Sequence, residues 1–350
     1  MFKTVEEGLA KIKVPSVEKP EDGRGQGFYN PVMKENRDIS VAVFSVFINK
    51  YFPSDKNVKI LDALTATGIR AIRYRKELDG VEVWATDVNE NAIKLAKKNA
   101  ILNNVKIKIE KKDANLIMHE RGFDIIDIDP YGTPVMFIDS AFHSIGRFGL
   151  LAVTATDTAA LNGVYPIVSE RRYGIKSVKT QFSKELGTRI ILTHIIREGM
   201  KYDKAFIPLL SYQSRHYIRL FGLIRKSVEK CNKLLRNIKY FFLADSKKNA
   251  DKIYLGPLHN KKFCSLVLKE LQKRKLDGKK IALLAHNELD IPFYYDIHKL
   301  ARIYKKNIPR TEKLIKRLKK HGYKASKTIF SDIGIKTNVK EAEVIKYFET

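Results

Sequence analysis

The sequence has few cysteines, a shortage of acidic relative to basic residues, and no long uncharged apolar stretch. Its two cysteines, Cys231 and Cys264, form no Cys-x-x-Cys pair, so a disulfide framework and a cysteine zinc site are both unsupported. No run of about eighteen uncharged apolar residues occurs, which argues against a transmembrane span. The N-terminal segment MFKTVEE is acidic and mixed, unlike a signal peptide. We therefore expect a soluble, cytoplasmic protein.

Positive charge is abundant and unevenly distributed. The 350 residues include 66 Lys and Arg against 39 Asp and Glu, a net charge of +27. From residue 226 onward there are 31 basic and 13 acidic residues, a surplus of +18, whereas the first 225 residues hold 35 and 26, a surplus of +9. Heat adaptation alone predicts abundant charge of both signs rather than this imbalance. The last third of the chain is therefore expected to face a polyanion such as nucleic acid.

The hydrophobic pattern predicts an α/β fold. At 44% hydrophobic residues the chain can build a sizeable core, and its length favours two domains over one. Predicted strands cover 58–62, 81–87, 105–110, 123–129 and 149–154, with a hairpin near 205–212 and 216–224. Predicted helices run from Asp38 or Ser40 to about Tyr51, over 68–78 and 89–103, after Pro134, and from Ser183 to about Gly199. Strands that alternate with helices in this way form a mostly parallel sheet.

The pattern changes near residue 225, where we expect a domain boundary. Strand-like segments at 238–244 and 253–255 precede a helical run over 261–276. Another helix is predicted to begin at Thr311 as N-cap, to stop at Gly322, and to bury Leu314, Ile315 and Leu318. Its other face carries five basic residues: Lys313, Lys316, Arg317, Lys319 and Lys320. This face is either solvated or in contact with phosphates, and the sequence leaves both interpretations open.

Acidic residues end or follow three successive predicted strands. They are Asp62, Asp87 and Asp113, and in an open parallel sheet ligands bind outside these strand ends. The turn DALTATG brings Gly68 to a helix start, where backbone can approach a ligand, yet it matches neither a dinucleotide nor a phosphate-loop motif. Asp87 is suited to accept ribose hydroxyls. The three acids in register fit the adenosine and sulfonium of S-adenosylmethionine, although each alone is also explained as a loop or cap residue.

The fourth strand ends in the strongest local motif, Asp127-Ile128-Asp129-Pro130-Tyr131-Gly132. An exocyclic base amine is a poor nucleophile because its lone pair is delocalised, and Asp129 can hold the amine hydrogens and then help remove a proton. Pro130 fixes the backbone, and Tyr131 can stack on an extruded base. A strand-terminal turn capped by Asp129 is the structural alternative, but it leaves the adjacent aromatic unexplained. A structural role suits Asp127 better.

A Gly-flanked aromatic segment, GQGFYNP, occupies residues 25–31. Phe28 and Tyr29 in this polar loop favour binding aromatics, with inward packing as the alternative. Further along, Arg37 is suited to bidentate pairing with a carboxylate.

Four motifs occur in order: FYNPVMKENRDIS, DALTATGIRAIRY, DIDPYGTP and YGIKSVKTQFSKELGTRIIL. Together they resemble the tRNA guanine-26 N2-dimethyltransferase family of archaea and eukaryotes. The resemblance covers about residues 24–225 and continues more loosely through YLGPLHNKKF and the segment 322–337.

The resemblance implies a class I S-adenosylmethionine-dependent methyltransferase fold. It implies a Rossmann-like, seven-stranded catalytic domain over 1–225 and a smaller basic α+β tRNA-binding domain over 226–350. The implied reaction is two methyl transfers from S-adenosylmethionine to the exocyclic N2 amine of guanine 26 in tRNA, giving N2,N2-dimethylguanosine. No protein partner is implied.

The same resemblance assigns roles to individual residues. In the cofactor site it implies Arg37 at the methionine carboxylate, Arg70 nearby, Asp62 and Gly68 in the first turn, Asp87 at the ribose, and Asp113 with Ala114 at the adenine. At the base it implies Asp129 and Pro130 around the target amine, with Tyr131 and Phe28 as stacking candidates.

One departure from the family is visible. Some members carry a cysteine cluster ahead of the GPL segment, but 240–254 contains no cysteine, so we expect no metal site. The histidines show no ligand spacing: His119, His143, His194, His216 and His286. Two other functions remain open, an amino-methyltransferase acting on adenine or guanine in DNA or another RNA, and a non-catalytic RNA-binding protein.

Overall fold

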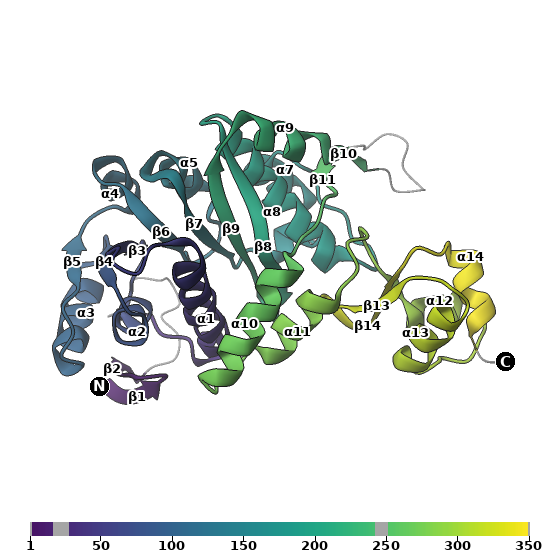
Figure 1. Cartoon of the computed structure of the whole chain (residues 1–350), viewed down its shortest axis with the longest axis horizontal. Helices are drawn as coiled ribbons and strands as arrows, with labels where there is room; N and C mark the ends of the chain where they lie inside the picture. Colours follow the sequence, from purple (N-terminus) through teal and green to yellow (C-terminus); the bar gives the residue numbers. More distant parts are fainter. Residues whose placement is uncertain (1, 17–27, 242–250, 349–350) are drawn as a thin grey trace.

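A mostly parallel seven-stranded sheet forms the centre of the computed structural model, which describes residues 2–16, 28–241 and 251–348 (Figure 1). The strand order is β5-β4-β3-β6-β7-β9-β8. The strands are β3 (Val58–Asp62), β4 (Val81–Asp87), β5 (Lys108–Lys111), β6 (Phe123–Ile128), β7 (Ile145–Ala155), β8 (Lys204–Ser214) and β9 (Tyr217–Lys226). Neighbours from β5 to β7 are parallel, and β9 is antiparallel to both β7 and β8. The predicted α/β class is confirmed, and so is the predicted hairpin, which is formed by β8 and β9.

Helices cover both faces of this sheet. They are α1 (Lys34–Tyr51), α2 (Ile69–Glu77), α3 (Glu90–Leu102), α4 (Ala114–Glu120), α5 (Val135–Ser144), α6 (Thr158–Leu161), α7 (Pro166–Tyr173) and α8 (Ser183–Met200). Apolar residues of α4, α5 and α8 share one core with the sheet, and those of α1 and α2 share the other. Removal of these side chains from water on both faces is the main stabilising contribution to such a layered fold.

Three predicted starts were wrong. β7 begins at Ile145 rather than residue 149, because Ile145 already pairs with Phe123 of β6. α1 begins at Lys34 because a 3-10 turn, Pro31–Met33, runs directly into it, and Asp38 and Ser40 are buried inside the helix rather than starting it. β5 begins at Lys108 rather than residue 105, because the backbone N–H groups of 103–105 still bond to carbonyls of α3.

An N-terminal hairpin of β1 (Phe2–Glu7) and β2 (Ala10–Pro15) packs against the helices beside the sheet (Figure 1). Its apolar side chains Ala10, Ile12 and Val14 bury against Ile69 and Ile72 of α2. The side-chain amides of Asn99 on α3 and of Asn103, its C-cap residue, each both accept from and donate to the backbone of β2 at 2.6–3.0 Å. Four such hydrogen bonds fix the hairpin in one register, because an unpaired buried amide is costly.

The chain after β9 first adds to the sheet region and then forms a core of its own. Its elements are α9 (Val228–Arg236), β10 (Ile238–Phe241), β11 (Asp251–Tyr254), α10 (Lys261–Lys273), α11 (Lys279–Asn287), β12 (Tyr295–Asp296), α12 (Ile297–Ile303), α13 (Thr311–Lys320), β13 (Ala325–Thr328), β14 (Ser331–Thr337) and α14 (Glu341–Val344). Phe263 and Val267 of α10 join the core under α1. A separate apolar cluster spans 297–348, which Figure 1 draws in yellow to one side of the sheet.

The C-terminal predictions were right in part. The helices at 261–276 and 311–322 are present as α10 and α13, but Arg310 rather than Thr311 is the N-cap residue, and Ile315 is only partly buried. The predicted strand at 238–244 is observed to Phe241, and its last three residues lie outside the described part of the chain.

Candidate active site

The acidic residues predicted at the strand ends lie along one edge of the sheet. Asp62 of β3 pairs in register with Asp127 of β6 and with Ala85 of β4, so Asp87 and Asp129 each extend two residues further toward the same edge. The segment after β5 stays beside β4, because the Lys112 N–H donates to the carbonyl oxygen of Asp87. The parallel strands thus collect the predicted cofactor and base residues at one edge, as expected for a site at the carboxyl ends.

The turn after β3 is held by Asp87. Its carboxylate accepts the backbone N–H groups of Ala66, at 3.0 Å, and of Asn89, at 2.9 Å. Gly68 then opens α2 with φ of +82°, and a Cβ there would lie 3.1 Å from the Cβ of Ala96. The turn therefore presents backbone at the sheet edge, and half-buried Asp87 keeps lone pairs for a further donor.

Asp62 lies beneath this turn and is fully buried. Its carboxylate accepts the Thr65 hydroxyl at 2.7 Å and the Ala71 N–H at 3.2 Å. Burial, and then the negative charge of Asp127, raise the pKa of Asp62 to about 7. Asp62 supports the turn from inside the protein and has no exposed surface for a ligand.

Asp113 is the N-cap residue of α4. Capping is the structural alternative that the sequence offers for each acid at a strand end. The Asp113 carboxylate accepts the N–H groups of Asn115, at 2.8 Å, and Leu116, at 3.3 Å. Ala114, the first residue of α4, is buried. Capping and ligand binding are compatible, because Asp113 is exposed at the end of β5 where the predicted adenine position lies.

The Asp129 carboxylate is oriented by Arg70 of α2. The Arg70 Nε–H donates to Oδ2 of Asp129 at 2.7 Å, and its Nη2 forms an ion pair with the same oxygen. Arg70 Nη2 also donates to Oδ1 of Asn36 at 2.8 Å. The guanidinium is almost fully buried, whereas 19% of the Asp129 side chain is exposed. Arg70 was predicted to lie in the cofactor site. It contacts the carboxylate of Asp129, the predicted catalytic residue, directly.

A buried cation on β9 lies behind this pair. Arg219 Nη1 donates to Oδ1 of Asp127 at 2.7 Å, and the Tyr74 hydroxyl donates to the other carboxylate oxygen at 2.5 Å. Burial acts to raise the pKa of Asp127, but the charges of Arg219 and Arg70 outweigh it and lower that pKa. Asp127 is thus a fully buried, fully paired structural acid, as predicted. We did not predict Arg219; the only signal was one arginine in the apolar run YIRLFGLI.

Two exposed aromatic rings meet next to Asp129. The rings of Phe28 and Tyr131 lie edge to face with centroids 5.7 Å apart, and they are 38% and 83% exposed. Inward packing therefore does not describe Phe28. Tyr29 is half-buried, with its hydroxyl on Glu7, while Gly25, Gln26 and Gly27 of the same motif lie outside the described residues.

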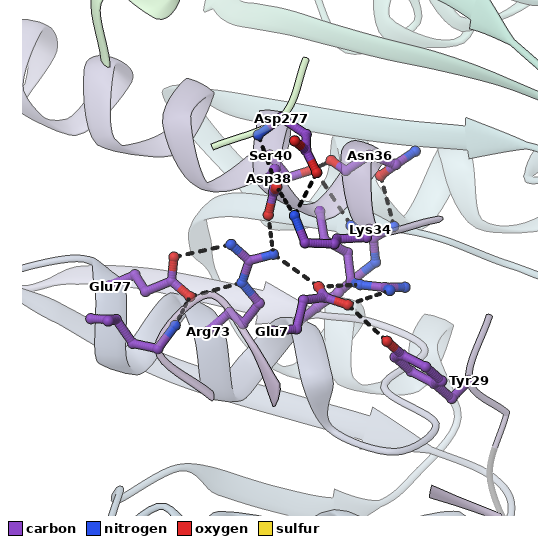
Figure 2. Close-up of polar contacts among 12 residues, drawn as sticks. Glu7, Tyr29, Lys34, Asn36, Asp38, Ser40, Arg73, Glu77 and Asp277 are labelled. Carbon is purple, nitrogen blue, oxygen red and sulfur yellow. Dashed lines mark hydrogen bonds and ion pairs between the residues drawn. The ribbon is translucent and has the colours of Figure 1, made fainter. Parts of the chain in front are cut away.

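Arg37 makes the bidentate pair expected of it, but with a carboxylate from the N-terminal hairpin. Its Nε and Nη2 donate to the two oxygens of Glu7, each at 2.6 Å. The pair belongs to a larger ionic network that joins the hairpin to α1 and α2 (Figure 2).

Comparison with known proteins gives this geometry its context. The family model of N2,N2-dimethylguanosine tRNA methyltransferases matches residues 8–349. The chain belongs to this family. Among curated relatives, a tRNA (guanine(26)-N(2))-dimethyltransferase of Thermococcus kodakarensis is 38% identical, over 98% of both chains. One of Methanobrevibacter smithii is 36% identical, over 99% of this chain and 97% of its own.

A solved structure resembles the whole chain. The complex of Trm1 from Pyrococcus horikoshii with S-adenosyl-L-methionine matches with a TM-score of 0.89 and 34% identity, over 99% of this chain and 100% of that one. The class I methyltransferase fold implied by the sequence resemblance is thereby confirmed.

In residues 2–16, 28–241 and 251–348, no three His, Cys, Asp or Glu side chains gather as metal ligands. No helix of the described chain has the length and hydropathy needed to cross a membrane.

Proposed function

We propose that this chain is a tRNA (guanine(26)-N(2))-dimethyltransferase, which transfers two methyl groups from S-adenosylmethionine to the exocyclic N2 amine of guanine 26. The observation that carries the proposal is the partly exposed Asp129 carboxylate, held by Arg70 two residues before Tyr131, whose exposed ring meets that of Phe28. Membership of the dimethylguanosine methyltransferase family supports the choice of base and of tRNA.

Asp129 is proposed to accept the target amine. Arg70 occupies Oδ2, and Oδ1 has no hydrogen-bond partner among the described residues, so Oδ1 is available for an N2 hydrogen. A bound methyl donor supplies an electrophilic sulfonium methyl. Each transfer would form one N–C bond, break the S–CH3 bond of the donor to leave S-adenosylhomocysteine, and release one N2 hydrogen as a proton, which Asp129 takes toward solvent. The Pro130 carbonyl is a second candidate acceptor, and stacking on Phe28 and Tyr131 would hold the extruded guanine.

The cofactor is proposed to lie along the edge formed by the turn after β3. Half-buried Asp87 would bind the ribose, and Asp113 with Ala114 would flank the adenine. The left-handed Gly68 lets this turn pack closely against α3, because a side chain there would crowd Ala96. Asp62 would contribute indirectly by supporting the turn, and Arg37 would meet the methionine carboxylate.

The C-terminal region is proposed to bind the tRNA. We propose a catalytic domain over 1–225 and a basic tRNA-binding domain over 226–350, because this second part carries a charge surplus of +18. A cytoplasmic location is proposed with it, since tRNA is the substrate.

The target base can be tested directly. Incubation of the purified chain with labelled S-adenosylmethionine and a tRNA transcript is expected to place label in N2,N2-dimethylguanosine, as read by nucleoside digestion and chromatography. Replacing G26 by A is expected to abolish labelling, because adenine has no N2 amine. Label in another nucleoside, or in DNA added to the reaction, would instead identify a different amino-methyltransferase.

The role of α13 is tested by salt dependence. Lys313, Lys316 and Lys320 are exposed on this helix, whereas Arg317 donates to the carbonyl of Tyr347 at 3.2 Å and is a poor choice for substitution. Changing the three lysines to Ala is expected to lower the slope of log affinity for tRNA against log salt by roughly three, about one per lost phosphate contact.

A matched control uses exposed lysines that are paired with acids. Lys11, Lys94 and Lys201 form ion pairs with Glu6, Glu90 and Glu198. Changing these three to Ala removes the same charge and is expected to leave the slope nearly unchanged. Equal slopes for both triple variants would mean that α13 does not contact phosphates.

A further inference from the structure

Glu7, at the end of β1, is an acid buried between two arginines. Only 2% of the residue is exposed. Its Oε1 accepts from Nε of Arg37 at 2.6 Å and from Nη1 of Arg73 at 2.9 Å. Its Oε2 accepts from Nη2 of Arg37 at 2.6 Å and from the Tyr29 hydroxyl at 3.1 Å (Figure 2). Burial acts to raise the pKa of Glu7, but its hydrogen bonds and charge pairing with Arg37, and then with Arg73, lower that pKa to about 2.

The place of Glu7 is set by the hairpin that carries it. The chain turns directly after it at Gly8, with φ of +56°, where an added Cβ would lie 2.7 Å from Nη2 of Arg73. The next N–H, of Leu9, donates to Oε1 of Glu77 at 3.2 Å. The side-chain amides of Asn99 and Asn103 also hold the backbone of β2. Together these contacts give the Glu7 carboxylate one position against α1 and α2.

Arg37 is only 5% exposed, and its partners among the described residues engage some of its guanidinium nitrogens but not all. A guanidinium has five N–H donors in a plane. The Nε–H and one Nη2–H are on Glu7, and Nη2 also donates to the Asn30 carbonyl at 3.1 Å. Nη1 has no hydrogen-bond partner among the described residues. The Tyr29 ring, 5.0 Å from the guanidinium carbon, lies against the group. Glu7 and Tyr29 therefore fix which way the Nη1 donors point.

Arg37 is also connected to the reaction centre. The preceding residue, Asn36, accepts from Arg70, which in turn binds Asp129. An anion bound at Nη1 would thus be held by the same turn of α1 that contacts Arg70 and, through Arg70, the predicted acceptor Asp129. In the proposed reaction, the anion that suits these donors is the carboxylate of the methionine part of the cofactor.

We propose that Glu7 is a positioning residue for cofactor binding: it holds Arg37 so that the Nη1 donors meet the amino-acid carboxylate of S-adenosylmethionine. The proposal rests on the proposed function, in that it takes the same cofactor. It assigns to the N-terminal hairpin a part in the cofactor site, although the hairpin contributes no strand to the sheet. The opposite possibility, that Glu7 competes with the cofactor for Arg37, predicts an effect of opposite sign.

The test compares two ligands that differ in the amino-acid part. S-adenosylhomocysteine carries the carboxylate, and 5′-methylthioadenosine lacks it. Glu7→Gln is expected to weaken S-adenosylhomocysteine binding roughly tenfold, as expected for misaligning one charged hydrogen-bonded contact, and to leave methylthioadenosine binding within about twofold. Calorimetric titration of each variant with both ligands measures this. In steady-state assays KM for S-adenosylmethionine is expected to rise while kcat changes little.

The controls change a neighbouring glutamate, remove Arg37, or shorten Glu7. Glu6→Gln makes the same change at the preceding residue, which is exposed and forms an ion pair with Lys11, and it is expected to alter neither affinity. In an Arg37→Met background, Glu7→Gln is expected to have no further effect on S-adenosylhomocysteine. Because Glu7→Gln leaves Arg73 short of one partner and could unfold the chain, Glu7→Asp serves as a second variant; it keeps the charge but retracts it, and is expected to weaken only the carboxylate-bearing ligand.

Three results would overturn the proposal. Equal weakening of both ligands would mean general damage, tighter S-adenosylhomocysteine binding would mean competition, and unchanged affinity would mean that Glu7 has no part in cofactor binding. The proposed tRNA activity fails separately: a wild-type chain that binds S-adenosylhomocysteine but labels no G26 refutes that activity and leaves this comparison valid.

Discussion

Replacing Asp129 by Asn is expected to lower the rate of methyl transfer by about 10²–10⁴-fold while tRNA affinity stays within about twofold. The amide keeps the shape of the side chain but has neither the negative charge that attracts the amine hydrogens nor the capacity to take a proton. It also removes the ion-pair partner of Arg70. Single-turnover labelling of tRNA measures the rate, and filter binding measures the affinity.

Asp124 provides a matched control for this substitution. It lies near the start of β6, the strand that Asp129 directly follows. Its side chain is also 19% exposed, and it pairs with Lys56 in the way that Asp129 pairs with Arg70. Asp124→Asn is expected to leave methyl transfer within about twofold, because this carboxylate lies at the opposite end of β6. If Asp129→Asn retained more than a tenth of wild-type turnover, another group would have to accept the amine hydrogens. Loss of tRNA binding in step with turnover would point to a non-catalytic role.

Replacing Arg219 by Met is expected to lower the free energy of unfolding by about 3–5 kcal/mol, the usual cost of removing one member of a buried ion pair. Arg219 and Asp127 are both fully buried, and Arg219 also donates to Thr154 at 2.8 Å and to Ser40 at 2.9 Å. Removing the guanidinium leaves three buried oxygen atoms short of a donor. Urea denaturation followed by circular dichroism measures the change.

Arg225, on the same strand, separates this effect from the mere loss of an arginine. It is exposed, over the Phe148 ring, so Arg225→Met is expected to cost within about 0.5–1 kcal/mol. A second check is Asp127→Asn in the Arg219→Met background. In Arg219→Met the buried Asp127 charge keeps only Arg70, at 3.4 Å, as a cationic partner among the described residues. Because Asn removes that poorly compensated charge, the double variant is expected to be more stable than the sum of the single effects predicts. Strict additivity, or a cost under about 1 kcal/mol for Arg219→Met, would contradict the buried-pair interpretation.

The sheet was predictable because its signals are local. β3 and β4 are short runs rich in apolar residues that end in an acid, and β6 is followed directly by Asp129. Period and composition mark such strands without reference to the rest of the chain. The motif DIDPYG could be interpreted in the same way, since the carboxylate, the rigid proline and the aromatic are consecutive. The family resemblance extended this to an activity, and the family model and the solved Trm1 structure bear it out.

The hairpin of residues 2–15 shows why other parts were missed. Its strands carry only three buried apolar side chains, and much of its position comes from amides of Asn99 and Asn103, more than eighty residues away. Nothing in an asparagine's own neighbourhood shows that it will pair with a distant strand. The start of α1 was misplaced for a related reason: Asp38, a good capping residue by type, instead faces Arg73 at 2.6 Å.

The sequence by itself determined the strand pattern, the basic C-terminal third and the residue types at the sheet edge, because these depend on short-range periodicity and composition. Only the tertiary structure decided the partner of each buried charge: Glu7 with Arg37, Asp129 with Arg70, Asp127 with Arg219, and Glu185 of α8 with Lys336 of β14 at 3.1 Å. A charge removed from water must find a counter-charge within a few ångströms, and which one it meets depends on how distant segments pack.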